Sequence, residues 1–444
     1  MSTTPASSPA DAARNFGLHS DMADQAVFDR AVQRFRDKKI ALPTFSQLAD
    51  PSTMPASVWE GLSGVDRNAA DPRNLFRVQW FNRLDGTGPT DVPDHVVLPP
   101  ELTGVEAPIV LAFGNRFPMI GAHKVLAAYS CLIPLLMTGR FDPTTHRAIW
   151  PSTGNYARGG VAISKIMGCR GVAVLPEGMS KERFDWLDAW IEDPDDVIRT
   201  VGTESNVKEI YDACAELAKN PTNVILNQFR EFSNHLGHYH VTGAALGRVA
   251  EHVLEQCGGG RLAAFVSASG SAGTLGAGDY LKDNFDARIV AVEALECPTM
   301  LYNGYGEHNI QGIGDKHLPL IHNVTNTDLV VGVSDQGSDT LDVVFNSDAG
   351  RANLIDRGVE REVVAALGHM GLSSIANALA AIKTAKHWNL GADDIMVIVA
   401  TDGSELYPSE RIKTTERLYA DGFDTRKAGA AVDQYLAGAD TEHV

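Results

Sequence analysis

The chain has 444 residues, of which 44% are hydrophobic and 21% are charged, and its formal net charge at pH 7 is −18. This composition is that of a globular protein, so it excludes a globally disordered chain. The negative charge disfavours binding to nucleic acid and to anionic membrane surfaces. The length suits two or three domains, or one large α/β enzyme. Glycine is over-represented, with 41 residues, which indicates many tight turns or close backbone contacts.

The cysteine pattern and the apolar segments indicate a cytoplasmic protein without a membrane span. The five cysteines contain no CxxC pair and are odd in number, which is typical of reduced cytosolic thiols. The N-terminal residues lack the apolar stretch of a secretory signal. The longest apolar stretch, 125–137, is too short to cross a bilayer and contains Pro134.

The N-terminal part of the chain shows little regular pattern. We expect a disordered tail over residues 1–20, a helix over 22–36, and irregular structure over 42–99 that wraps onto a larger body. This stretch is rich in Pro, Asp and Asn, which are residues typical of turns.

From about residue 100 onward, apolar runs of strand length alternate with amphipathic stretches. The expected strands are 109–113, 147–150, 171–175, 224–226, 263–266, 288–292, 329–333 and 395–400. The expected helices include 125–137, 161–167, 205–217 with Ser205 as its N-cap, and 373–388. This alternation predicts a mostly parallel sheet that binds ligands at the carboxyl ends of its strands.

A cluster of glycines lies directly after one of the expected strands, over residues 269–278. A loop of small residues between a strand and a helix exposes backbone N–H groups that bind phosphate. A dinucleotide site would also explain Glu293 near the end of the next strand, but the GxxGxxGxG spacing departs from the GxGxxG pattern. Tight helix–strand packing alone is the third interpretation.

Two further features point to an anion and a reactive amine. The loop over 151–160 (PSTGNYARGG) stands between a strand and a helix, and suits a second anion such as a carboxylate. Lys124 opens the apolar stretch 125–137. A lysine at such a position often extends toward solvent, but a desolvated one becomes nucleophilic. A phosphate loop, a carboxylate loop and a buried lysine together suggest pyridoxal phosphate on a Schiff-base lysine.

Eight motifs in sequence order, spread over residues 105–410, resemble the cysteine synthase / tryptophan synthase β family of pyridoxal-phosphate enzymes. The lysine motif resembles that of tryptophan synthase β, and most of the others resemble cysteine synthases. The motifs are 121–124 (GAHK), 152–155 (STGN), 176–180 (PEGMS), 227–243 (with NQF and NHLGHYHVTG), 270–274 (GSAGT), 310–314 (IQGIG), 371–374 (GLSS) and 401–407 (TDGSELY).

The resemblance implies a tryptophan-synthase-like α/β fold (fold type II), with two three-layer α/β/α domains and the cofactor between them. The large domain would comprise 96–114 and 233–415, and the small domain 115–232. Residues 1–95 would be a partly disordered extension, and 416–444 a partly helical surface tail. The family also implies a homodimer.

The resemblance assigns a role to each matching position. Lys124 would form the Schiff base and then act as the base at the substrate α-carbon. Asn155 would bind the cofactor's 3′-oxygen, Ser373 (or Ser374, one residue along) would face the pyridine nitrogen, and His123 would contact the phosphate. The backbone of Gly270, Ser271, Ala272, Gly273 and Thr274 would hold that phosphate. Ser152, Thr153, Gly154, Tyr156 and Gln228 would contact the substrate, an amino acid.

A serine beside the pyridine nitrogen favours one type of reaction. Unlike an aspartate, it does not stabilise a protonated nitrogen, so the ring is a weaker electron sink and the loss of a β-substituent is favoured. We therefore expect β-elimination or β-replacement on a serine- or cysteine-like amino acid through an aminoacrylate intermediate. The alternatives are a hydroxy-amino-acid dehydratase or a racemase on the same fold, and a catalytically silent binding protein.

Several residues allow more than one interpretation. Tyr156 replaces the small hydroxyl residue of cysteine synthases and would reshape the substrate pocket. Arg116 would either bind a substrate anion or lie on the surface. The histidines at 235, 238 and 240 have HxxHxH spacing, but without a nearby acidic or cysteine ligand we expect packing and no metal. Asp402 and Glu405 would shape the turn beside the pyridine ring.

Overall fold

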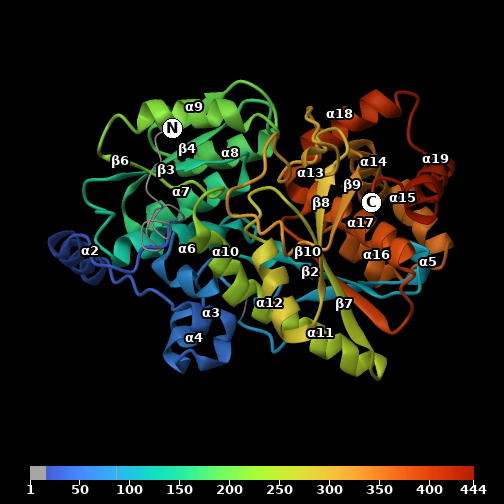
Figure 1. Cartoon of the computed structure of the whole chain (residues 1–444), viewed down its shortest axis with the longest axis horizontal. Helices are drawn as coiled ribbons and strands as arrows, with labels where there is room; N and C mark the ends of the chain where they lie inside the picture. Colours follow the sequence, from blue (N-terminus) through green and yellow to red (C-terminus); the bar gives the residue numbers. More distant parts are fainter. Residues whose placement is uncertain (1–16, 87) are drawn as a thin grey trace, which may run out of the picture.

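The structure, a computed structural model, describes residues 17–86 and 88–444. Two β-sheets form the centre of the molecule, with helices packed on both faces of each (Figure 1). The six-stranded sheet takes its strands from residues 95–113 and 261–400, and the four-stranded sheet from 147–225. The eight strands expected from the sequence are all present, with ends that differ by at most two residues. The predicted domain boundaries stay a prediction.

The larger sheet is parallel except for one edge strand. Its order is β1 (His95–Leu98), β2 (Ile109–Phe113), β10 (Asp394–Ala400), β7 (Arg261–Ala268), β8 (Arg288–Ala294) and β9 (Leu329–Val333). β1 pairs with β2 in the antiparallel direction. In the central strand β10, Val397 and Val399 face one cluster of buried side chains, whereas Met396 and Ile398 face the other. Burial on both faces explains why these strands read as continuous apolar runs.

The smaller sheet is entirely parallel. Its order is β5 (Val197–Thr200), β4 (Arg170–Pro176), β3 (Arg147–Pro151) and β6 (Asn223–Ile225). Helix α7 (Asn155–Met167) packs on one face, and α9 (Val207–Leu217) packs on the other. The sequence did not predict β1 or β5, which are four-residue edge strands with mostly half-buried side chains.

The remaining elements surround the sheets. They are α2 (Gln25–Asp37), α3 (Phe45–Ala49), η1 (Pro51–Thr53), α4 (Ala56–Leu62), η2 (Pro72–Arg77), α5 (Pro100–Thr103), η3 (Gly114–Arg116), α6 (Lys124–Met137), α8 (Lys181–Trp190), η4 (Pro194–Asp196), α10 (Phe232–Gly237), η5 (His238–Gly243), α11 (Ala244–Cys257), α12 (Leu275–Phe285), α13 (Thr299–Tyr302), α14 (Asp335–Asn346), α15 (Asp348–Asp356), α16 (Arg361–Leu367), α17 (Leu372–Trp388), η6 (Ser404–Leu406), α18 (Pro408–Leu418), α19 (Thr425–Val432) and η7 (Asp433–Ala437). In the larger sheet, α17 covers one face, and α11 and α12 cover the other.

Two expectations about helices need correction. Helix α7 begins at Asn155 and not at residue 161, so the loop that was expected to end at 160 already forms the first turns of the helix. Ser205 is not the N-cap of α9, because that helix begins at Val207 after Asn206. The Ser205 hydroxyl donates instead to the carbonyl of Gly306, 2.7 Å away, so it connects two loops.

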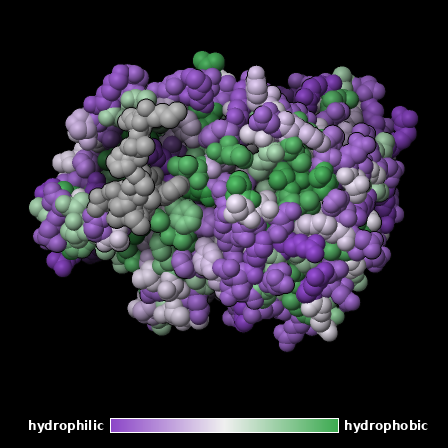
Figure 2. Space-filling model, in the orientation of Figure 1, coloured by the Kyte–Doolittle hydropathy of each residue, from purple (hydrophilic) through white to green (hydrophobic). Residues whose placement is uncertain are grey.

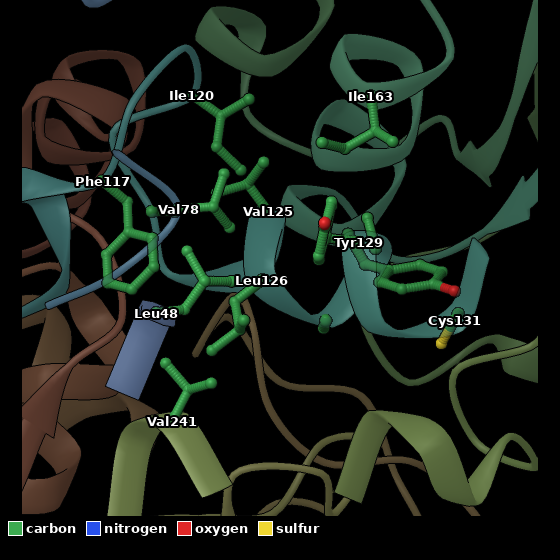
Figure 3. Close-up of a cluster of buried hydrophobic side chains, with 14 of the residues drawn as sticks. Leu48, Val78, Phe117, Ile120, Val125, Leu126, Tyr129, Cys131, Ile163 and Val241 are labelled. Atoms are coloured by element: carbon green, nitrogen blue, oxygen red, sulfur yellow. The ribbon is translucent and has the colours of Figure 1, made fainter. Parts of the chain in front are cut away.

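The N-terminal segment is part of the main core. The stretch 42–99 was expected to be irregular, but it contains α3, η1, α4, η2 and the whole of β1. Leu48 and Val78 pack against Val125 and Leu126 of α6 (Figure 3). The predicted tail over 1–20 lies mostly outside the described residues.

The surface in the view of Figure 2 is mostly hydrophilic, in keeping with the net charge. Within the described residues, no helix is both long and apolar enough to cross a membrane. All five cysteines are free.

One buried hydrogen bond joins the N-terminal segment to the body, and its loss should be measurable. The indole N–H of Trp80 donates to Thr242 Oγ1, 2.9 Å away, and the same hydroxyl contacts His238 Nδ1. Thr242→Val leaves both groups buried and unpaired, so we expect the free energy of unfolding to fall by about 1–3 kcal/mol. Thr384→Val is the matched control, because that hydroxyl donates only to a carbonyl of its own helix. Equal thermal unfolding midpoints for the two variants would contradict the assignment.

Candidate active site

Lys124 is the first residue of α6 and lies at the centre of the site. Its ammonium group is 3.2 Å from Ser271 Oγ and 3.3 Å from Gln228 Oε1. The side chain is buried, and burial lowers the pKa of Lys124 to about 8. A lysine with such a pKa has an appreciable fraction of free amine at neutral pH, so it can act as a nucleophile and as a base.

Backbone contacts fix the position where α6 begins. Ala122 forms an isolated β-bridge with Asp402, and the N–H of His123 donates to the carbonyl of Thr401. The carboxyl end of β10 therefore holds the residues that lead into Lys124.

The expected phosphate loop connects β7 to the N-terminus of α12. Ala272 has a φ of 62°, a left-handed conformation that is uncommon for a residue with a side chain. A Cβ on Gly270 would lie 3.0 Å from the carbonyl oxygen of Gly312, and one on Gly273 would collide with the side chain of Asn234. Close packing therefore excludes a side chain at Gly273 unless Asn234 moves, and it disfavours one at Gly270. The loop ends at a helix N-terminus, where backbone N–H groups and the helix dipole favour an anion.

The second expected anion loop lies at the carboxyl end of β3 and enters α7. Gly154 has a φ of 149°, and a Cβ there would lie 2.6 Å from Arg183 Cδ, so this position requires glycine. Ser152 Oγ accepts a hydrogen bond from the N–H of Gly154, 2.9 Å away. Thr153 Oγ1 donates to Glu204 Oε1. This loop faces Lys124 across a small cavity, which Ser152, Thr153, Asn155, Gln228, Gly270 and Ser271 line together.

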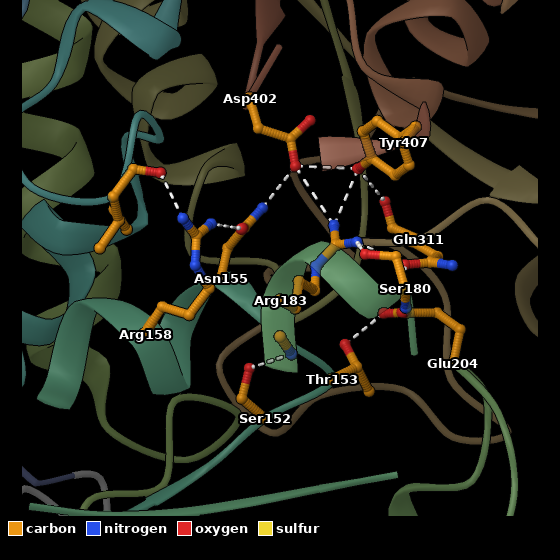
Figure 4. Close-up of polar contacts among 12 residues, drawn as sticks. Ser152, Thr153, Asn155, Arg158, Ser180, Arg183, Glu204, Gln311, Asp402 and Tyr407 are labelled. Atoms are coloured by element: carbon orange, nitrogen blue, oxygen red, sulfur yellow. Dashed lines mark hydrogen bonds and ion pairs between the residues drawn. The ribbon is translucent and has the colours of Figure 1, made fainter. Parts of the chain in front are cut away.

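A buried polar network connects the two sheets behind this loop (Figure 4). Asn155 Nδ2 donates to Asp402 Oδ2, 2.6 Å away, and Arg158 donates to Asn155 Oδ1, 2.9 Å away. Arg183 forms an ion pair with the same oxygen of Asp402 at 3.3 Å, and both residues are fully buried. The hydroxyl of Tyr407 lies 2.8 Å from each of them. Asp402 therefore does more than shape a turn, because its carboxylate joins α7, α8 and β10.

Tyr156 belongs to the wall of the cavity, and Ser373 lies next to that wall. Tyr156 lines the cavity, and its hydroxyl donates to the carbonyl of Leu226, 3.0 Å away. A Cβ on Gly312, another residue of the wall, would lie 3.8 Å from Ser373 Oγ. The hydroxyls of Ser373 and Ser374 are both buried, and neither has a hydrogen-bond partner among the described residues. The proximity to Gly312 favours Ser373 as the residue that faces the site.

His123 lies in an aromatic environment beside the site. Its ring packs against Trp80, Phe117 and His238, and burial lowers the pKa of His123 to about 3, so the ring is neutral. Neither ring nitrogen has a hydrogen-bond partner in the part of the chain that the structure describes. Its predicted contact with the phosphate stays a prediction.

Two histidines of the HxxHxH segment contact other side chains of the protein. His235 Nε2 lies 3.1 Å from Asp279 Oδ2, and His238 contacts Thr242. Among residues 17–86 and 88–444, no group of three or more His, Cys, Asp or Glu side chains is placed to hold a metal ion.

Arg116 is not the surface residue that one of its two interpretations expected. It is buried and pairs with Asp94 at 2.6 Å. It does not line the cavity that contains Lys124, so its binding to a substrate anion stays a prediction.

Sequence reasoning missed two acidic residues of the cavity wall, Glu204 and Asp315. Burial raises the pKa of Glu204 to about 8 and raises the pKa of Asp315 well above its usual range. Asp315 directly follows the 310–314 motif, which offered a signal. Glu204 lies in the loop between β5 and α9, where the sequence offered none.

Known proteins resemble this chain in sequence and in fold. A family model described as "Pyridoxal-phosphate dependent enzyme" matches residues 113–402, more than half of the chain. The chain belongs to this family. A probable cysteine synthase from Bacillus subtilis is 30% identical over 293 residues, which cover 65% of this chain and 85% of that protein. Cysteine synthase B from Campylobacter jejuni is 28% identical over 258 residues, which cover 56% of this chain and 75% of that protein.

Solved structures agree with this pyridoxal-phosphate enzyme in fold. A cysteine synthase from Entamoeba histolytica superposes with a TM-score of 0.60 at 22% identity, covering 78% of this chain and 93% of the other. A hydrogen sulfide-producing enzyme from Fusobacterium nucleatum gives a TM-score of 0.59 at 21% identity, covering 74% and 98%. These structures confirm the predicted tryptophan-synthase-like, fold type II architecture, and the family match confirms the predicted cofactor.

The residues of this site fit pyridoxal phosphate. The loop at the N-terminus of α12 is closely packed, and its tight contacts disfavour larger residues at Gly270 and Gly273. The hydroxyl of Ser373 beside Gly312 has no partner among the described residues, so it would be available to the pyridine nitrogen. The buried amine of Lys124 lies between the two anion loops.

The buried ion pair of the network should contribute strongly to stability. Asp402→Asn keeps the shape of the side chain but leaves the charge of Arg183 buried without its partner. We expect the free energy of unfolding to fall by about 3–5 kcal/mol. Asp421→Asn is the control, because Asp421 pairs with Lys427 at an exposed position and should leave the thermal midpoint nearly unchanged. If the thermal midpoint changed only slightly in both variants, the buried charge of Arg183 would not need Asp402 for its stabilisation.

Proposed function

We propose that this pyridoxal-phosphate enzyme catalyses β-elimination or β-replacement on a serine- or cysteine-like amino acid. The observation that carries the proposal is the position of Lys124, whose amine lies between a phosphate loop and a carboxylate loop with Ser373 in the same site. The relatives named as cysteine synthases support this reaction class.

Each group of the site has a proposed binding role that follows from its position. The backbone of Gly270 to Thr274 would hold the cofactor phosphate at the N-terminus of α12, with His123 as a second contact. Asn155 would orient the 3′-oxygen, since Asp402 and Arg158 fix its amide. Ser152, Thr153, Gly154 and Gln228 would hold the substrate carboxylate, and Tyr156 would close the pocket.

Lys124 would remove the proton from the substrate α-carbon. Burial lowers the pKa of this amine to about 8, so a minor but appreciable fraction is neutral at pH 7 and can accept a proton. The bound cofactor supplies an electron sink for the α-carbon. Ser373 offers the pyridine nitrogen a hydroxyl and not a carboxylate, which favours loss of a β-substituent over a long-lived carbanion.

We also propose that the enzyme is a homodimer and that it is located in the cytoplasm. Exposed apolar side chains at Tyr302, Tyr305, Leu318, Leu320 and Val324 support a subunit contact in the region 302–324.

The role of Lys124 can be tested by substitution. We expect the purified wild-type protein to be yellow, and Lys124→Ala to lose the visible absorbance and about 10²–10⁴-fold in rate. Lys219→Ala, at an exposed position just after α9, should retain both. A colourless wild-type protein without affinity for pyridoxal phosphate would contradict the proposed function.

The reaction class can be separated from its alternatives with a panel of β-substituted amino acids. Release of a 2-oxo acid, or of a β-replacement product when a thiol is added, supports the proposal. Exchange of the α-proton with deuterium, without loss of a β-group, would instead indicate a racemase. Activity confined to serine and threonine would indicate a dehydratase, and the absence of any turnover a binding protein.

A further inference from the structure

Two buried carboxyl groups lie in the wall of the cavity that contains Lys124. Glu204 belongs to the loop between β5 and α9, and Asp315 to the loop that precedes β9. Their exposed fractions are 2% and 6%. Neither carboxyl has a place in the proposed handling of the phosphate or of the substrate carboxylate, both of which are anions.

Each carboxyl group has one oxygen that is available to a ligand. Glu204 Oε1 accepts from the hydroxyl of Thr153 (Figure 4), whereas Glu204 Oε2 and Asp315 Oδ2 are buried without a hydrogen-bond partner among the described residues. A buried acceptor without a partner is energetically costly. Two such acceptors in the wall of one cavity indicate that a donor-rich ligand group completes them.

The charges around this pair identify the kind of donor. Among the described residues, Lys124 is the one cationic side chain in the cavity wall, and in the proposed reaction its amine is committed to the cofactor. Arg183 also attracts Glu204, but its guanidinium is already occupied by other partners. These partners are Asp402, Tyr407, Gln311 and Ser180. The carboxylate of Asp402 repels a negative charge on Glu204. Burial raises the pKa of both carboxyl groups, because the cations near them are committed to other groups. A bound ammonium group would lower these pKa values again and stabilise the two carboxylates, whereas an anionic β-substituent would raise them further. The pair therefore favours a cationic β-substituent over an anionic one.

We propose that Glu204 and Asp315 select an amino acid whose β-substituent is an amine, such as a 2,3-diamino acid. This inference rests on the proposed function and adds the substrate class to it. The α-carboxylate would bind at the loop 152–155, and the β-ammonium group would donate to Glu204 Oε2 and Asp315 Oδ2. Thr153 contacts Glu204 directly, so it connects the two parts of the recognition site.

The test uses the holoenzyme and three amino acids that differ in the charge of the β-substituent: L-2,3-diaminopropionate, O-acetyl-L-serine and O-phospho-L-serine. Dissociation constants come from titration of the visible spectrum, and kcat/KM comes from release of the 2-oxo acid. We expect diaminopropionate to bind most tightly and phosphoserine least tightly.

Isosteric variants then assign the preference to the two carboxyl groups. Glu204→Gln and Asp315→Asn should each weaken binding of diaminopropionate by about ten- to a hundredfold, change O-acetylserine by less than about threefold, and improve phosphoserine. Glu177→Gln, at an exposed position outside the cavity, is the matched control and should change none of the three.

The outcomes distinguish the two levels of the proposal. If no member of the panel binds or reacts, the proposed function fails. If O-acetylserine or phosphoserine is turned over and diaminopropionate is not bound more tightly than they are, the proposed function stands and the amine preference is wrong. The charge series in the wild-type enzyme gives this result even where a variant fails to fold. If both variants bound all three amino acids more weakly by the same factor, the selective role of Glu204 and Asp315 would likewise be wrong.

Discussion

The buried ion pair between Arg183 and Asp402 is the interaction on which the arrangement of the site depends. Asp402 follows the central strand of the larger sheet, and Arg183 lies on α8 beside the smaller sheet. The backbone of Asp402 bridges Ala122, two residues before Lys124, while its carboxylate holds Asn155 at the start of α7. One residue therefore positions both the lysine and the loop that faces it. Desolvation raises the pKa of Asp402, and Arg183 and Asn155 offset this effect.

The parts of the fold that the sequence predicted are those governed by local pattern. Strands such as β10 are buried on both faces, so their apolar runs are continuous and easy to recognise. The glycine clusters are also local signals, since Gly154 and Gly273 cannot bear a side chain without a collision. The glycine pattern therefore indicates where the two expected anion loops lie. In these loops, close packing against Arg183 and Asn234 accounts for the glycines.

The parts that the sequence did not predict depend on contacts between distant segments. β1 and β5 are short edge strands with partial burial, so their pattern is weak. Glu204 enters the cavity wall only because its loop approaches Thr153, and no local pattern encodes that approach. Arg116 was expected to be a ligand or a surface residue, whereas it pairs with Asp94 and packs over the ring of Phe113. The N-terminal segment was expected to lack regular structure, but its apolar side chains belong to the main core.

Chemical trapping tests most directly whether Lys124 carries the cofactor. The holoenzyme is treated with borohydride, which reduces a Schiff base to a stable secondary amine, and the protein is then digested and analysed by mass spectrometry. We predict a single pyridoxyl modification, on the peptide that contains Lys124. A modification on any other lysine, or none in a protein that contains pyridoxal phosphate, would contradict this description of the site.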